Sequence, residues 1–144
     1  MTKKEKINFS NKLVLDAGPL IDYLCDVGVA ELVQNDIVDN NKVIQIIISP
    51  LTLTEIYYVL CRQRGAKFAL ESIQKIRNAV KIELEFNIRE LAGNYKCERA
   101  FSLADCYVLA TAKINSATAI FKREQELDDE LSKAPLDVDI LILD

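Results

Sequence analysis

Acidic side chains are the residues of this chain best suited to chemistry. The sequence has 22 acidic residues and no histidine. The lack of histidine excludes Ser-His and Cys-His nucleophile systems and histidine-bound zinc, so hydrolytic chemistry must depend mainly on carboxylates, lysines or tyrosines. Ligands bind outside the carboxyl ends of parallel strands, and helix N-termini attract anions. Four acids follow predicted strands or stand in the first turns of helices: Asp16, Glu55, Asp105 and Glu124.

Carboxylates that meet in this way form a site for a divalent cation. Held close together they repel one another, and some stay protonated unless a counter-charge is present. Mg²⁺ or Mn²⁺ relieves the repulsion, because both ions prefer hard oxygen ligands and keep bound waters. One or two ions can then orient and deprotonate a water for hydrolysis. We expect Asp16 and Asp105 to be the main ligands, with Glu55 and Glu124 binding through water or holding a second ion.

Apolar runs of strand length must position these acids. Residues 13–15 meet Asp16 and are followed by Ala-Gly-Pro, which predicts a strand, a tight turn and a helix with Pro19 in its first turn. The run VIQIII at residues 43–48 predicts a buried strand, and Ser49-Pro50 predicts the start of a helix that ends before Gly65. Further strands are expected over residues 82–86, 117–121 and 138–143, and further helices from about residue 28 and over residues 67–80, 88–99, 103–115 and 123–131.

Strands that alternate with helices predict crossover connections and a parallel sheet covered on both faces. The fold class is therefore α/β: a three-layer α/β/α sandwich with a mostly parallel sheet of four or five strands. The length of 144 residues predicts a single domain over residues 1–144, with a frayed start over residues 1–11. No apolar stretch reaches the roughly 18 residues that span a bilayer, so we expect a soluble, cytoplasmic protein without a membrane partner.

Helical periodicity predicts where Glu55 and Asp105 face. Each acid lies roughly 150° from the apolar stripe of its helix, so both are expected to point away from the core, toward a cleft or toward solvent. Simpler roles are also open, since Ser102 and Asp105 have capping-box spacing and Asp16 could cap the Gly-Pro turn. The two stripes are Leu53, Ile56, Tyr57 and Leu60 in the first helix, and Leu103, Cys106, Tyr107, Ala110 and Ile114 in the second.

Three of the four acids, Asp16, Glu55 and Asp105, each lie in a short segment that resembles a segment of a known family, and the three segments follow one another in the same order as in that family. These are LVLDAGPLI at residues 13–21, ISPLTLTE at residues 48–55 and SLADCYVLATA at residues 102–112. Together they resemble the PIN-domain family over nearly the whole chain. Membership implies a divalent-metal ribonuclease, most often the toxin of a toxin–antitoxin pair that cuts structured or transfer RNA. It also implies a homodimer and an antitoxin protein as partners.

The fourth acid departs from the family pattern. After the fourth strand the family usually has a Thr or Ser followed by an Asp, whereas this chain has FKREQEL at residues 121–127. Glu124 is the best match but lacks the neighbouring hydroxyl, and Glu126 or Asp128 could take its place. This departure favours one alternative function, a non-catalytic PIN-like module that binds RNA or protein. A phosphatase with an aspartate nucleophile is less favoured, because it needs a second Asp where the chain has Gly18.

Charge and cysteine content narrow the possibilities further. The net charge of −4 argues against a protein that coats nucleic acid non-specifically, but it allows an enzyme that holds a phosphodiester through metal ions. The cysteines lack zinc-site spacing and are expected to be small core residues. Basic residues near the acids are either candidate phosphate contacts or part of a solvated face: Arg62, Arg64, Lys67, Lys122 and Arg123.

Overall fold

A five-stranded, all-parallel sheet organises the chain. The computed structural model describes residues 11–144, so the expected frayed start lies, apart from Asn11, outside the described residues. The strand order is β3-β2-β1-β4-β5, which confirms the predicted parallel sheet and α/β class. The strands are β1 (Lys12–Leu15), β2 (Gln45–Ile48), β3 (Lys81–Ile82), β4 (Thr118–Lys122) and β5 (Ile140–Leu143).

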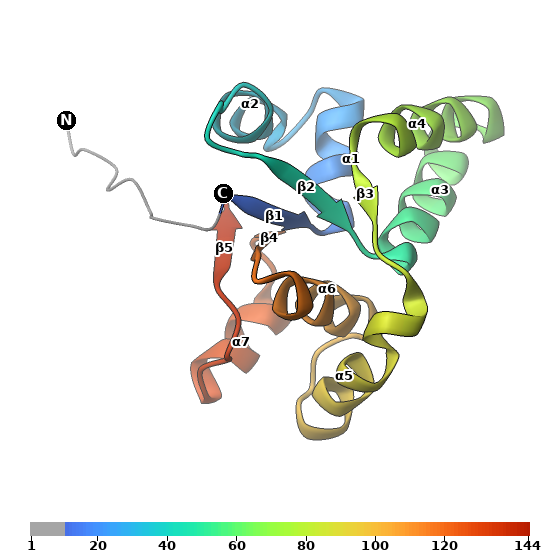
Figure 1. Ribbon diagram of the computed structural model, residues 1–144. Helices are drawn as coiled ribbons and strands as arrows, with labels where there is room; N and C mark the ends of the chain where they lie inside the picture. Colours follow the sequence, from blue (N-terminus) through green and yellow to red (C-terminus); the bar gives the residue numbers. More distant parts are fainter. Residues whose placement is uncertain (1–10) are drawn as a thin grey trace.

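Helices cover both faces of the sheet and make the predicted three layers (Figure 1). One buried core lies between the sheet and α1–α4, and it receives Leu13, Leu15 and Ile120 from the strands. The other core lies between the sheet and α5–α7 and receives Val14 and Phe121. The helices are α1 (Ala17–Cys25), α2 (Ala30–Val33) with a π-helical turn η1 (Gln34–Val38), α3 (Pro50–Arg64), α4 (Ala66–Ala79), α5 (Glu85–Glu98), α6 (Leu103–Asn115) and α7 (Gln125–Lys133).

Strand β1 is the centre of the sheet and pairs with β2 on one side and β4 on the other. Val14 lies opposite Ile47, and Leu15 lies opposite Ile120, so the carboxyl ends of the three strands share one edge. From β1 the chain moves outward to β2 and β3, and then crosses back to β4 on the far side of β1. The point where this order reverses is where open α/β sheets place their ligands.

The strand expected over residues 82–86 was wrong beyond its first residue. Strand β3 ends at Ile82, and α5 begins at Glu85. Leu84 and Phe86, which lie in the expected strand, are 66% and 74% exposed. The chain leaves the sheet because the buried Glu83 carboxylate accepts hydrogen bonds from the backbone amide of Leu84 and from Asn115 Nδ2.

Two of the predicted apolar stripes also differ from the buried faces. In α3 the buried residues are Thr52, Ile56 and Leu60, whereas Tyr57 is 38% exposed. In α6 Leu103 and Ile114 are exposed, and burial extends nearly all round the helix between Asp105 and Ala112. A single stripe describes a surface helix, but α6 packs on the sheet and on α5. No helix within residues 11–144 has the length and apolar character to cross a membrane.

Two ion pairs fasten the helices around the carboxyl edge of the sheet. Asp22 of α1 is buried, pairs with Lys122 Nζ of β4 at 2.8 Å and accepts the backbone amide of Val29 at 3.0 Å. Arg99 donates to Glu130 Oε1 at 2.9 Å and to the backbone oxygens of Glu130 and Ala134. The first pair ties α1 to β4, and the second ties α7 to the end of α5.

Gly28 lies within the first of these contacts. Its φ of +53° is left-handed, and a Cβ at this position would stand 2.1 Å from Asp22 Oδ2. Gly93, in the middle of α5, has an ordinary helical backbone and nothing within 4 Å of an added Cβ. The same substitution is therefore expected to act in opposite directions at the two positions.

Gly28→Ala should lower the free energy of unfolding by roughly 1–3 kcal/mol, because it adds backbone strain and displaces the Asp22 carboxylate. Gly93→Ala should raise it by about 0.5–1 kcal/mol, because alanine loses less backbone entropy in a helix. Urea unfolding followed by circular dichroism measures both changes. Equal shifts of the same sign would contradict the role of Asp22 in this turn.

Candidate active site

Asp16 stands at the centre of the carboxyl edge of the sheet. It follows β1 directly, and its backbone amide donates to Ile120 O of β4 at 3.0 Å. It occupies the N-cap position of α1, but its side chain makes no capping hydrogen bond. The side chain is also buried, with the residue only 7% exposed. Capping therefore does not explain this aspartate.

Glu55 reaches the same edge from the layer of α1–α4. Ser49 follows β2 and caps α3, since its Oγ accepts the backbone amide of Leu51 at 3.1 Å. Pro50 is the first helical residue, as the sequence predicted. Glu55 is half-buried, and its Oε1 is a buried oxygen without a hydrogen-bond partner. A carboxylate oxygen in that situation lacks the compensation that a buried polar atom normally has.

Asp105 comes from the opposite layer, in the first turn of α6. Ser102 is the cap of this helix, and its Oγ accepts the backbone amide of Asp105 at 3.1 Å. Asp105 is only 8% exposed, so of the two settings expected for it, a cleft and open solvent, it does not occupy open solvent. Its enclosure follows from the burial of α6 on most of its circumference between Asp105 and Ala112.

The connection between β4 and α7 contains the fourth acid. Glu124 is exposed at the N-cap position of α7 and makes no capping hydrogen bond there. Asp128 is already paired, accepting from Arg123 at 3.0 and 3.1 Å. Glu126 is exposed on the first turn of α7.

The four carboxyl groups act on one another through their charges. Burial raises the pKa of Asp16 to about 7, and the charges of Asp105, Glu55 and Glu124 add to the rise, against a lowering by the amide of Ala17. Burial and then Glu124 raise the pKa of Asp105 to about 6, with smaller contributions from Glu55 and Glu126 and a lowering by Ser102. Burial and Glu124 also raise the pKa of Glu55. Asp16, Glu55, Asp105 and Glu124 therefore share one electrostatic site.

Of the three acids considered for the fourth position, Glu124 is the one that acts on each of the other three carboxylates. Glu126 contributes only to the pKa of Asp105, and Asp128 contributes to none of them. This charge coupling therefore favours Glu124 as the fourth member. Catalysis by these four residues stays a prediction.

The donor set fits a hard divalent cation. Its groups are carboxylate oxygens, two of the acids are held partly protonated near neutral pH without a counter-charge, and Glu55 Oε1 has no partner. Within residues 11–144, no three acidic or cysteine side chains are already arranged as a metal centre. The four acids thus provide the oxygen ligands, but their side chains must change conformation before they can coordinate one ion together.

Four of the five basic residues named from the sequence divide into two kinds, and the fifth, Lys67, is exposed on α4. Lys122 is committed to Asp22, and Arg123 pairs with Asp128 and with Asp144, so both brace the β4–α7 connection. Sequence reasoning assigned no role to Asp22, because its partner Lys122 lies 100 positions away and no local signal links them. Arg62 and Arg64 instead lie over aromatic rings, those of Tyr58 and Phe68.

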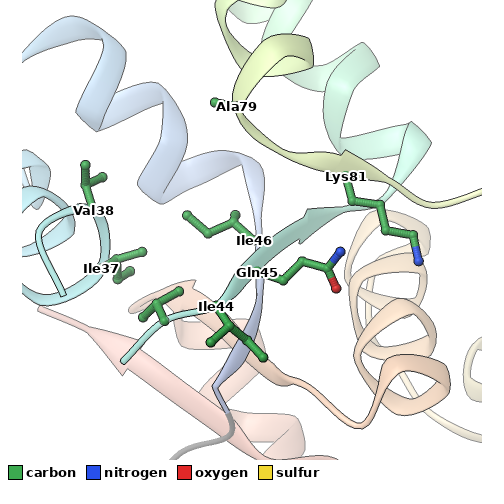
Figure 2. A pocket seen from close by; sticks show the side chains of 8 residues that line it. Ile37, Val38, Ile44, Gln45, Ile46, Ala79 and Lys81 are labelled. Atoms are coloured by element: carbon green, nitrogen blue, oxygen red, sulfur yellow. The ribbon is translucent and has the colours of Figure 1, made fainter. Parts of the chain in front are cut away.

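A separate hollow of about 330 Å³ lies at the other end of β2, where Val38 and Ile44 line one part and Ala79 and Lys81 another (Figure 2). None of its lining residues is acidic. Among the residues that the structure describes, Lys81 is the one ionisable side chain that lines it, so the shared site of the carboxylates is the candidate active site.

Comparison with known proteins agrees with this fold. The family model for the PIN domain matches residues 13–130, and the chain belongs to the PIN domain family. No curated protein matches the sequence. Among solved structures, the DNA-bound VapBC of Salmonella typhimurium has a TM-score of 0.66 at 13% identity, covering 91% of this chain and 97% of that chain.

Two further structures have the same fold. VapBC-1 of nontypeable Haemophilus influenzae has a TM-score of 0.65 at 14% identity, covering 91% of this chain and 97% of that chain. The sarcin-ricin loop cleaving toxin VapC20 of Mycobacterium tuberculosis has a TM-score of 0.61 at 16% identity, covering 74% and 86%. At these identities the likeness establishes the architecture alone.

The raised pKa of Asp16 makes a prediction about stability in the absence of metal. The folded-state pKa of about 7 lies above the ordinary value of 3.8, so the folded protein binds the proton more tightly than the unfolded chain. The contribution of Asp16 to the free energy of unfolding should therefore be most favourable below about pH 4. It should be lost as the pH rises through about 7. Thermal unfolding in EDTA between pH 4 and 8 measures this slope.

Asp16→Asn should reduce that slope, so that the variant is more stable than the wild type at pH 8 and similar at pH 4. Glu71→Gln, on an exposed face of α4, is the matched control and should follow the wild type. Parallel curves for all three proteins would show that Asp16 is not destabilised in the folded state.

Proposed function

We propose that this protein is a divalent-metal-dependent endoribonuclease, acting as the toxin of a toxin–antitoxin pair. The observation that carries the proposal is the convergence of acids from all three layers on the carboxyl edge of the sheet. Asp16 comes from the central strand, Glu55 from one helical layer and Asp105 from the other. Membership of the PIN domain family supports nuclease chemistry at this edge.

Asp16 and Asp105 would be the main ligands, since they are the most buried of the four acids and have the clearest need for a positive charge. Glu55 would direct its unpartnered Oε1 toward the same ion or its water. Mg²⁺ or Mn²⁺, when bound, supplies activation of a water and neutralisation of charge on the phosphodiester. No protein nucleophile is required.

The remaining side chains of the site hold these acids in position. Ser102 orients Asp105 by capping α6, and Ser49 fixes the start of the helix that carries Glu55. The pairs of Lys122 with Asp22 and of Arg123 with Asp128 hold the connection that carries Glu124. Loss of one of these supports should weaken activity through geometry rather than through chemistry.

The partners proposed for this chain are an RNA substrate, an antitoxin protein and a second copy of the chain. The antitoxin is supported by a solved structure of the same fold, a toxin-antitoxin complex from Klebsiella pneumoniae. An RNA substrate is supported by the family and by the sarcin-ricin loop cleaving toxin of Mycobacterium tuberculosis. The homodimer rests on the family resemblance.

Cleavage of RNA by the pure protein tests the proposed function. A pool of transfer and messenger RNA should be cut in Mn²⁺ or Mg²⁺ and left intact in EDTA. Asp16→Asn and Asp105→Asn should abolish cleavage with the fold intact by circular dichroism. Asp139→Asn, an exposed acid at the opposite end of the sheet, should retain it. Cleavage that persists in EDTA and in both variants would reject the carboxylate mechanism.

The same assay identifies the fourth acid. Glu124→Gln should reduce cleavage more than Glu126→Gln or Asp128→Asn, because Glu124 alone of these acts on all three other carboxylates. No cleavage by the folded wild type on any RNA would instead favour the alternative, a non-catalytic PIN-like module that binds RNA or protein.

Light scattering after size exclusion tests the homodimer. The pure protein should elute with about twice the mass of one chain over a tenfold range of concentration. A single-chain mass across that range would reject the dimer without bearing on the nuclease.

A further inference from the structure

Helix α3 extends from the candidate active site with an ordered set of side chains on one face. At 100° per residue, Tyr58 and Arg62 lie within about 60° of Glu55 around the helix. With a rise of 1.5 Å per residue, they stand about 4.5 Å and 10.5 Å further along its axis. The buried residues Thr52, Ile56 and Leu60 occupy a different face. A surface therefore continues directly from the Glu55 carboxylate along α3.

This surface combines an exposed ring with an exposed guanidinium. Tyr58 is 44% exposed, and Arg62 Cζ lies 5.3 Å from the centroid of its ring. Among the ion pairs of residues 11–144, none involves Arg62, whereas Lys122 and Arg123 are committed to acids. Arg62 thus brings positive charge to the neighbourhood of the four carboxylates without a carboxylate that neutralises it.

We propose that Tyr58 and Arg62 form a subsite for single-stranded RNA next to the site of cleavage. A nucleobase stacks on the exposed part of the Tyr58 ring, and the adjacent phosphate pairs with Arg62. Stacking on aromatic side chains and contacts of arginine with phosphate are how proteins hold unpaired nucleotides without reading their sequence. The subsite rests on the proposed ribonuclease function. It specifies in addition that the RNA substrate is single-stranded next to the bond that is cut.

The chain offers matched controls on the same helix. Tyr57 lies about 200° and Arg64 about 180° from Glu55, so both face the opposite side of α3. Tyr57 is 38% exposed, close to the value for Tyr58. Arg64 lies over the ring of Phe68, as Arg62 lies over Tyr58. Arg64 also donates from Nη2 to Cys25 O at 3.4 Å. Each test substitution nevertheless has a partner of the same residue type on the opposite side of the helix, away from the site.

Fluorescence anisotropy with a short, labelled single-stranded RNA of random sequence tests the subsite. Ca²⁺ replaces Mg²⁺ so that binding is measured without dependence on cleavage. Tyr58→Ala should weaken affinity about tenfold, and Tyr58→Phe should restore it, because the ring and not the hydroxyl stacks. Arg62→Gln should weaken affinity and reduce the salt dependence by about one phosphate contact. Tyr57→Ala and Arg64→Gln should bind as the wild type does.

The outcomes separate this inference from the proposed function. Unchanged affinity in Tyr58→Ala and Arg62→Gln, or no RNA binding by the wild type, would overturn the subsite. A change in oligomeric mass without a change in RNA affinity would identify the surface as a protein contact and also overturn it. Binding that depends on Tyr58 and Arg62 in a protein that never cuts RNA would uphold the subsite and reject the nuclease.

Discussion

Repulsion between poorly solvated carboxylates is the constraint on which the rest of this structure depends. Asp16 is fixed at the end of the central strand, and Asp105 is enclosed in the first turn of α6, so neither can move far into water. The free energy cost of holding them together is met by packing elsewhere in the fold. A fold that tolerates this cost in the absence of metal gains a site that favours a cation.

Other buried acids in the chain are treated differently. Arg99, Lys133 and the amide of Ala100 surround the Glu130 carboxylate and lower its pKa to about 2, whereas burial and neighbouring acids raise that of Asp16 to about 7. Asp22, likewise buried, has Lys122 and the amide of Val29 as partners. Among the described residues, buried acids with a cationic partner serve the architecture, and Asp16 and Asp105, buried without one, mark the place where a cation is needed.

The distribution of cations follows the same logic. Lys122 and Arg123 lie nearest in sequence to Glu124, but both form ion pairs that brace the end of β4. Lys122 pairs with Asp22, and Arg123 pairs with Asp128 and Asp144. Arg62, displaced along α3 from the carboxylates, lies instead over the ring of Tyr58. A chain with a net charge of −4 can in this way present a short basic and aromatic surface beside an acidic site.

The sequence alone predicted the parallel sheet and most of its strands and helices, because caps, strand-length apolar runs and helical periods are local patterns. It also singled out Asp16, Glu55 and Asp105, whose catalytic role stays a prediction. Only the tertiary structure decided what depends on neighbours distant in the chain. Leu84 and Phe86 lie in the expected strand but are exposed, and Asp105 is enclosed because α6 packs on the sheet and on α5. The preference for Glu124 and the pairing of Lys122 with Asp22 likewise arise where separate segments meet, since burial and charge coupling are properties of assembled layers and not of any one segment.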